Sequence, residues 1–408
     1  MPLAARIQQI TGVPLAAQVP LFVMMFGHGA THWMGTAFYM LLPWIKEDLS
    51  LNYLAAGSLV AATYLSSLLA NLGSGVLVDL TGRRVVIQCG ALVLGATALA
   101  GTALSESAMQ LAVLVSLVSA SGMIWHPAAI PFLASLYPNN RGYALSTHSL
   151  GANLGDFLAP LALGILLGGF TWQTSALLAA LPVVLVVLLL GWTLNQRSEL
   201  NPSSTLKNND ARGYWKSLKQ LGTHRILLGL CLTCGFYGAA QTGLLMFIPI
   251  YLADHLQTSP LVTGFGLAAL QFGGIIAAPV AGVVSDRIGR KPIVVFSLAG
   301  TTLLVLGLGL ASSTEVFVAF VLLLGFLLFA IRPVTQSWCM DLAPASIGGT
   351  AISLLFGFKS VFSMVTPMLY GVIADTWGLQ EVFWCLAALT FVATSLAFLL
   401  PSATRSAS

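Results

Sequence analysis

Stretches of about 20 apolar residues recur twelve times along this chain, and no other feature limits its folding as strongly. A helix needs about 20 mostly apolar residues to cross the hydrocarbon core of a bilayer. Composition agrees, because 57% of the 408 residues are hydrophobic and only 7% are charged, whereas soluble domains carry roughly a quarter charged residues. The bilayer is therefore the expected solvent of this chain.

We predict an all-α membrane protein with twelve transmembrane helices in two pseudo-symmetric six-helix bundles around a central cavity. The expected domains are an N-terminal bundle at 1–194, a cytoplasmic linker at 195–224 and a C-terminal bundle at 225–408, because the only long polar stretch follows the sixth span. The expected spans are 19–43, 53–78, 85–105, 109–134, 144–169, 173–194, 225–253, 261–284, 292–312, 315–340, 350–374 and 381–401.

Lysine and arginine residues gather in the loops on one side of this arrangement. Fourteen of the 17 fall on that side, whereas Lys46 lies on the other and Arg332 and Lys359 lie within spans. Basic loops face the cytoplasm, so a multi-pass protein of the cytoplasmic (inner) membrane with both termini cytoplasmic is expected. Because the basic residues form no single patch, we expect no nucleic-acid partner. We also expect the protein to be a monomer.

The two halves of the chain repeat each other at a nearly constant distance. Two copies of one six-helix unit are typical of transporters, in which the solute site lies near the bilayer midplane between the repeats. Five pairs are separated by 206 residues and three by 207: Pro43 and Pro249, Pro127 and Pro333, Pro138 and Pro344, Gly142 and Gly348, Gly151 and Gly357, then Gly75 and Gly282, Asp79 and Asp286, Pro160 and Pro367.

One short loop motif occurs in both halves, as GVLVDLTGRR at 75–84 and GVVSDRIGRK at 282–291. Each copy places an aspartate at a helix end, then a glycine that allows a tight turn, then two basic residues. The aspartate can pair with arginine across a cytoplasmic gate. An ordinary basic loop is the alternative for a single copy, but two copies at matching positions favour a gate. The expected gating residues are Asp79, Arg83, Arg84, Asp286 and Arg290.

These motifs resemble the cytoplasmic signature of the major facilitator superfamily, and the resemblance covers essentially the whole chain. Within that superfamily, GHGATHWMGTAFYMLLPWIKEDL, SASGMIWHPAAIPFLASLYPNNRGYALS and GANLGDFLAPLALG look like the bacterial branch that includes fosmidomycin-resistance exporters. The chain departs from that branch at His32, where relatives usually carry aspartate, and at Asp156, where a small or apolar residue is commoner. The resemblance implies a secondary transporter, with efflux by antiport as the branch's function.

Eight polar side chains fall within the predicted spans, where an ionisable group costs about 2.5–3.5 kcal/mol on insertion scales. Helix geometry places His28 and His32 on one face, and His148 and Asp156 within one stripe. Each stripe is expected to face a cavity. The eight positions are His28, His32, His126, His148, Asp156, Gln241, Arg332 and Lys359.

Arg332 and Lys359 are cations in a half that has no acidic residue deep within a span. Either Asp156 compensates them across the cavity or an anionic substrate does; arginine suits a bidentate grip on carboxylate or phosphonate. The alternative is that each cation snorkels or binds backbone carbonyls. A small organic anion is therefore the expected substrate. The expected substrate-binding residues are Arg332, Lys359, His126, Gln241, His28 and Asn153.

Histidine takes up and releases a proton near neutral pH, and Asp156 is the only carboxylate deep in a span. We therefore expect Asp156, His32 and His148 to couple transport to protons. The alternative for the histidines is that they are interior polar residues satisfied by hydrogen bonds. The resulting hypothesis is a proton-coupled exporter of a small organic anion that works by alternating access.

Two further transport functions remain open: transport of a metal ion or anionic metal chelate, since imidazole and carboxylate suit transition metals, and proton-symport uptake of a carboxylate. An enzyme is not expected, because only six histidines are available as ligands. A receptor is not expected either, because the central loop is too short for an output domain. No cofactor or resident metal is expected, and no GxxxxGK[ST] nucleotide motif occurs.

Overall fold

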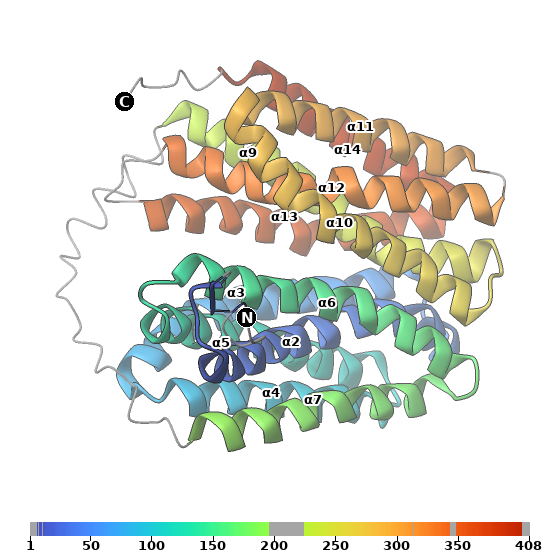
Figure 1. The fold of residues 1–408 in the computed structure, drawn as a ribbon. Coiled ribbons are helices and arrows are strands. Elements are labelled where there is room, and N and C mark those ends of the chain that lie inside the picture. The colour runs from blue at the N-terminus through green and yellow to red at the C-terminus, as the bar shows by residue number, and fades with distance from the viewer. Residues whose placement is uncertain are drawn as a thin grey trace. The chain divides into compact units, whose positions relative to one another are not determined.

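The computed structural model describes residues 11–195, 224–311, 313–342 and 348–401, together with Arg6, Gln8 and Gln9. Within these ranges the chain is helical without strands, as Figure 1 shows, which confirms the predicted all-α class. The twelve long helices described are α2 (Leu15–Asp48), α3 (Tyr53–Thr81), α4 (Arg84–Thr102), α5 (Ala108–Leu136), α6 (Arg141–Leu167), α7 (Trp172–Asn195), α9 (Arg225–Ile250), α10 (Pro260–Ile288), α11 (Arg290–Leu310), α12 (Thr314–Leu342), α13 (Gly348–Trp377) and α14 (Leu379–Leu399), and the π-helical turn η2 (Tyr251–His255) continues α9.

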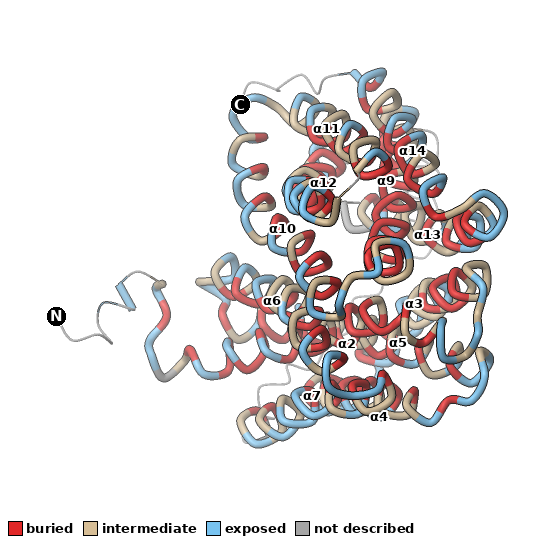
Figure 2. Tube along the Cα trace, turned by 90° about the vertical axis from the view of Figure 1, so that its right-hand side faces the viewer, coloured by how far each residue is buried: buried red, intermediate tan, exposed pale blue. Residues whose placement is uncertain are grey.

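Eleven candidate membrane spans occur among the described helices, by length and apolar composition. The remaining helix, α2, is not among them; it carries two histidines and two threonines among its apolar residues. Exposed and buried residues alternate along the helices (Figure 2), and the exposed ones include large apolar side chains such as Leu104, Trp192 and Leu399. So many exposed apolar side chains suit contact with lipid and not with water.

The chain divides into two compact units. The first comprises Met1–Leu41 and Leu65–Leu206, and the second comprises Leu42–Tyr64 and Lys207–Ser408. The end of α2 and the start of α3 therefore group with helices of the second unit, although the sequence places them in the N-terminal bundle. The expected linker at 195–224 lies almost wholly outside the described residues.

Close approach of α2 to α6 shapes the first unit. A Cβ atom added at Gly155 would collide with the carbonyl oxygen of Gly29, and one added at Gly151 would collide with that of Met25. Small residues let helix backbones approach in this way. Around this pair, α4 packs against α5 and α7, and α6 also contacts α5 and α7. The approach places the polar side chains of α2 against those of α6.

In the second unit, α10 packs against α12, α9 packs against α13 and α14, and α11 packs against α12 and α14. The hairpin Leu42–Tyr64 is fastened to these helices by polar contacts. Lys46 Nζ lies 3.1 Å from Asp254 Oδ2 in η2. The backbone amides of Tyr53 and Leu54 both donate to Asp375 of α13, each at 2.9 Å.

Candidate functional site

Four histidines of the first unit form one cluster, which we call the histidine cluster: His28 and His32 of α2, His126 of α5 and His148 of α6. The ring of His28 lies at the centre. Its centroid is 4.9 Å from that of His32, 5.0 Å from that of His126 and 3.9 Å from that of His148, on which it stacks. Three helices thus bring together the four histidines that the sequence singled out.

Backbone carbonyls orient two of these rings. His28 Nδ1 donates to the carbonyl oxygen of His148 at 2.8 Å, and His126 Nδ1 donates to that of Gly122 at 2.8 Å. A carbonyl oxygen can only accept, so the hydrogen of each neutral ring lies on Nδ1. The Nε2 atom of each ring then carries a lone pair.

Asp156 of α6 orients the third ring. Its Oδ2 atom lies 2.9 Å from His32 Nδ1, and its Oδ1 atom accepts a hydrogen bond from Thr36 Oγ1 at 2.6 Å. Both carboxylate oxygens are thereby engaged by α2. Thr36 was missed by the sequence reasoning, although it lies four residues after His32 and so on the same helix face.

Trp125 is a second residue that the sequence reasoning missed. Its Nε1 atom donates to His148 Nε2 at 3.2 Å, and its indole is parallel to the imidazole. The side chain is fully buried. An interior tryptophan needs a partner for its N–H, and its position next to His126 is the sequence signal that could have drawn attention to it.

The second unit holds the two cations that the sequence placed within spans. Lys359 of α13 donates from Nζ to Gln241 Oε1 of α9 at 2.7 Å, and its ammonium lies 5.4 Å from the ring centroid of Tyr237. Arg332 of α12 lines the same small pocket as Lys359. The structure therefore brings Arg332, Lys359 and Gln241 to neighbouring helices of one unit.

No carboxylate lines this pocket, and within the described part of the second unit none pairs with either cation. The cavity is about 10 Å³ in volume, which is about the space of one water molecule. The lining residues are Cys234, Tyr237, Arg332, Thr335, Gln336, Leu355, Phe356 and Lys359.

The other three residues expected to bind substrate, His28, His126 and Asn153, lie in the first unit. His28 and His126 belong to the histidine cluster. Asn153 lies half-buried on α6, and no contact found among the described residues joins its side chain to the cluster. The structure thus groups the predicted binding residues within each unit.

The second copy of the loop motif forms an ion-pair network. Arg290 contacts the Asp286 carboxylate, donates from Nε to Asp341 Oδ2 at 3.1 Å and donates from Nη1 to Ser285 at 2.7 Å. Gly289 has a φ of +98°, a conformation that glycine adopts without strain, so the predicted tight turn is present.

The first copy has the same backbone turn. Gly82 has a φ of +62° between α3 and α4, and Arg83 and Arg84 follow directly. Asp79 lies in the last turns of α3, but its side chain is outside the described part of the chain. Its predicted ion pair therefore stays a prediction.

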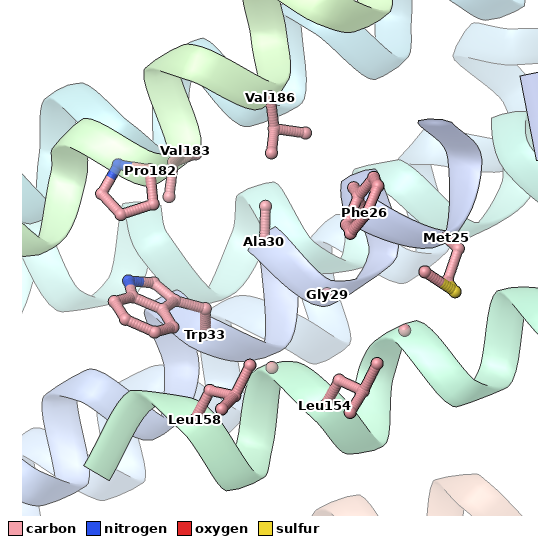
Figure 3. A pocket seen from close by; sticks show the side chains of 12 residues that line it. Met25, Phe26, Gly29, Ala30, Trp33, Leu154, Leu158, Pro182, Val183 and Val186 are labelled. Atoms are coloured by element: carbon pink, nitrogen blue, oxygen red, sulfur yellow. The ribbon is translucent and has the colours of Figure 1, made fainter. Parts of the chain in front are cut away.

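An apolar pocket lies between α2, α6 and α7 (Figure 3). Its volume is about 220 Å³. Trp33 closes one side, where its Nε1 atom donates to the carbonyl oxygen of Ala179 at 2.9 Å. The lining residues are Met25, Phe26, Gly29, Ala30, Trp33, Gly151, Leu154, Gly155, Leu158, Pro182, Val183 and Val186.

Comparison with known proteins gives matches over almost the whole chain. The model of the Major Facilitator Superfamily matches residues 21–251 and 230–408. The multidrug resistance protein MdtG of Proteus mirabilis is 24% identical over 384 residues, which cover 91% of this chain and 93% of that protein. MdtG of Citrobacter koseri is 25% identical over 366 residues, covering 87% and 88% respectively.

Two solved structures share the fold. A mutant form of the nucleoside transporter NupG superposes with a TM-score of 0.81 at 12% identity, covering 94% of this chain and 99% of that one. A bacterial homologue of the human lysosomal transporter Spinster, inward-facing and unoccupied, gives 0.79 at 15% identity, covering 95% and 97%. At these identities the likeness concerns the fold.

Proposed function

This chain belongs to the major facilitator superfamily and is a multi-pass membrane transporter, not an enzyme, and we propose that its substrate is a small organic anion, exported in exchange for protons. The superfamily resemblance drawn from the loop motifs is confirmed. The resemblance to the fosmidomycin-resistance branch stays a prediction, as does the orientation with both termini in the cytoplasm.

One observation carries the anion proposal: Arg332 and Lys359 line one pocket that has no carboxylate. Two like charges in a membrane-embedded pocket repel each other and lose hydration, so a bound anion lowers the free energy of the pair. Gln241 is neutral, so it orients the Lys359 ammonium through its amide oxygen without cancelling the charge. The pair is thereby left able to bind an anion.

The size of the pocket favours binding of one charged group and not of a whole solute. At about 10 Å³ the cavity admits a group about the size of one water, so one oxygen of a carboxylate or phosphonate would enter while the remainder lies outside. Arginine can grip such a group with two parallel hydrogen bonds, and lysine adds a point charge.

The energy for export has to come from a gradient, because the sequence carries no phosphate-binding loop. We take the proton gradient as the source. Relatives named as multidrug resistance proteins support outward transport. The assignment of the proton path to Asp156, His32 and His148 stays a prediction.

The test is transport into inside-out vesicles with an imposed pH gradient, using a panel of radiolabelled carboxylates and phosphonates. Lys359→Gln and Arg332→Gln should each raise the apparent substrate constant at least tenfold, since one charged contact contributes about 1.4 kcal/mol or more. Arg225→Gln, at the exposed start of α9, is the matched control and should transport normally. Unchanged apparent substrate constants in both Lys359→Gln and Arg332→Gln would contradict the proposal that these residues bind the anion.

Export of apolar drug-like compounds is a second candidate, favoured by the apolar pocket beside Trp33 and by the names of the relatives. A neutral lipophilic dye in the same panel separates the two functions. Dye export that is lost in Trp33→Ala and kept in Lys359→Gln would support this candidate, whereas transport of anions alone would exclude it.

A further inference from the structure

Three imidazoles of the histidine cluster converge on one point. One ring nitrogen of each of His28, His32 and His126 lies within 4.8 Å of the other two. Two of the rings, His28 and His32, come from neighbouring turns of α2, and the third, His126, comes from α5, far away in the sequence. From this convergence we infer that the three side chains bind one divalent transition-metal ion of the Zn²⁺, Co²⁺ and Ni²⁺ group. The sequence led us to expect no resident metal.

The hydrogen bonds decide which atoms would bind the ion. In all three rings Nδ1 is engaged: by the carbonyl oxygen of His148 for His28, by the carboxylate of Asp156 for His32, and by the carbonyl oxygen of Gly122 for His126. Because each of these partners accepts a hydrogen bond, each Nδ1 carries the hydrogen and each neutral ring presents the lone pair of Nε2. The Nε2 atoms are therefore the metal ligands.

The same hydrogen bonds have the pattern found around metal ions in proteins. A metal-binding histidine almost always donates its other N–H to a carboxylate or a backbone carbonyl, which fixes the tautomer and the ring orientation. Here two rings donate to carbonyls and His32 donates to Asp156, whose second oxygen is held by Thr36. The supporting contacts of a metal site are thus in place around all three rings.

The Nε2 atom of His28 is the strongest single indication. It is buried and has no hydrogen-bond partner within the described structure, and the residue is only 7% exposed. A buried polar atom without a partner costs on the order of 1–3 kcal/mol. A metal ion at the point of convergence would remove that cost.

The geometry requires only a small adjustment. A tetrahedral ion with bonds of about 2.0–2.1 Å holds its nitrogen ligands about 3.3 Å apart. One nitrogen of each ring, Nδ1 or Nε2, now lies within 4.8 Å of the other two, and a separation of that size closes to about 3.3 Å when each ring moves by less than about 1 Å, which side-chain rotation can supply. The site is therefore close to its metal-binding arrangement.

The donor set selects the metal. Neutral imidazoles suit zinc, cobalt and nickel, whereas magnesium and calcium require oxygen ligands. The fourth histidine of the cluster, His148, already accepts a hydrogen bond from Trp125 at Nε2, so it does not complete the coordination. A tetrahedral ion keeps one position open, to a water molecule or to a donor atom of a solute.

This inference goes beyond the proposed function, because the anion is assigned to the second unit and the metal to the first; a metal-bound His32 takes up no proton, so the predicted proton path would then be left to Asp156 and His148. The test uses the full-length protein in detergent, with an affinity tag that contains no histidine. Titration with Co²⁺ should give visible absorption bands of tetrahedral intensity that saturate at one ion per chain and disappear when Zn²⁺ is added. Lys359→Gln should bind Co²⁺ normally, so failure of the anion site and failure of the metal site can be told apart.

Variants locate the ion. His126→Gln and His32→Gln should each abolish the absorption bands, and Asp156→Asn should weaken Co²⁺ binding by about 10–100-fold, the usual cost of losing a supporting hydrogen bond. His255→Gln in η2 is the matched control and should leave the titration unchanged. All variants are compared after elution as one symmetric peak in size-exclusion chromatography. An absence of bands in the well-folded wild type, or equal Co²⁺ affinity in His126→Gln and wild type, would overturn the inference.

Discussion

At the scale of single residues, Asp156 orients the His32 ring of the histidine cluster. Its two oxygens are bound by His32 and Thr36, which come from the same face of α2. An ionised carboxylate inside a membrane protein persists only where such partners replace water. The hydrogen bond from Thr36 is therefore part of what keeps Asp156 in place.

We predict that Thr36→Val, which removes this donor while keeping the shape of the side chain, destabilises the protein. Thr36 is buried, and loss of a hydrogen bond to a charged group costs about 1.5–3 kcal/mol. The melting temperature in detergent should fall by several degrees. Thr36→Ser should restore most of the loss, and Thr97→Val, whose exposed hydroxyl bonds only within α4, should have little effect. Equal melting temperatures for Thr36→Val and Thr97→Val would contradict the prediction.

At the scale of elements, the approach of α2 to α6 brings the cluster together. A Cβ atom at Gly155 would collide with the Gly29 carbonyl and lie 3.0 Å from the backbone nitrogen of Trp33. Backbone atoms in two packed helices cannot move aside as a flexible side chain can. The glycines of α2 and α6 are therefore required for the contact between His32 and Asp156.

Alanine substitution at two glycines should have opposite effects. Gly155→Ala should force α2 and α6 apart and destabilise the protein by about 1–3 kcal/mol. Gly35→Ala, where an added Cβ meets nothing within 4 Å, should be neutral or slightly stabilising, because alanine favours a helix by up to about 1 kcal/mol over glycine. Thermal unfolding measures both. If Gly155→Ala and Gly35→Ala lowered the thermal stability by similar amounts, the close approach of α2 to α6 would not be the reason that residue 155 is a glycine.

The sequence predicted the helices well because a run of about 20 apolar residues has few alternatives in a bilayer. It predicted that His28 and His32 share a face, since that follows from a spacing of four. It did not predict the full length of α2, Leu15–Asp48, because backbone hydrogen bonds carry a helix past the apolar run. Nor did it predict that Asp156 would bind Thr36, because contacts between helices depend on packing and not on spacing along the chain.

At the scale of the whole molecule, the hairpin Leu42–Tyr64 belongs to the first half by sequence and to the second unit by its contacts. Under the proposed alternating-access mechanism, in which one half of the transporter rocks against the other, these contacts would break and form again during each transport cycle. They include Asp254, which binds both Lys46 and the Tyr53 hydroxyl. Asp375 accepts two hydrogen bonds from the first turn of α3.

Asp375 is the residue whose loss should loosen this hairpin most. The first amides of a helix lack partners within the helix and carry partial positive charge, so a carboxylate there is stabilising. Asp375→Ala removes both acceptors at once, and an exposed side chain that caps a helix N-terminus in this way contributes about 0.5–2 kcal/mol. The variant should therefore favour the conformation in which the hairpin has separated from α9 and α13.

A cysteine at Thr242 can report this change, because the Thr242 hydroxyl is buried and donates to Tyr64 of the hairpin. The background lacks the native cysteines, and a membrane-impermeant maleimide is added on the side of the membrane that carries Lys46. It should label Thr242→Cys about tenfold faster when Asp375→Ala is present, since about 1.4 kcal/mol corresponds to a factor of ten. Glu47→Ala, an exposed acid beside Lys46, is the control and should not alter the rate. Labelling of Asp375→Ala at the control rate would mean that other contacts, such as the approach of Gly57 to Pro367, hold the hairpin closed.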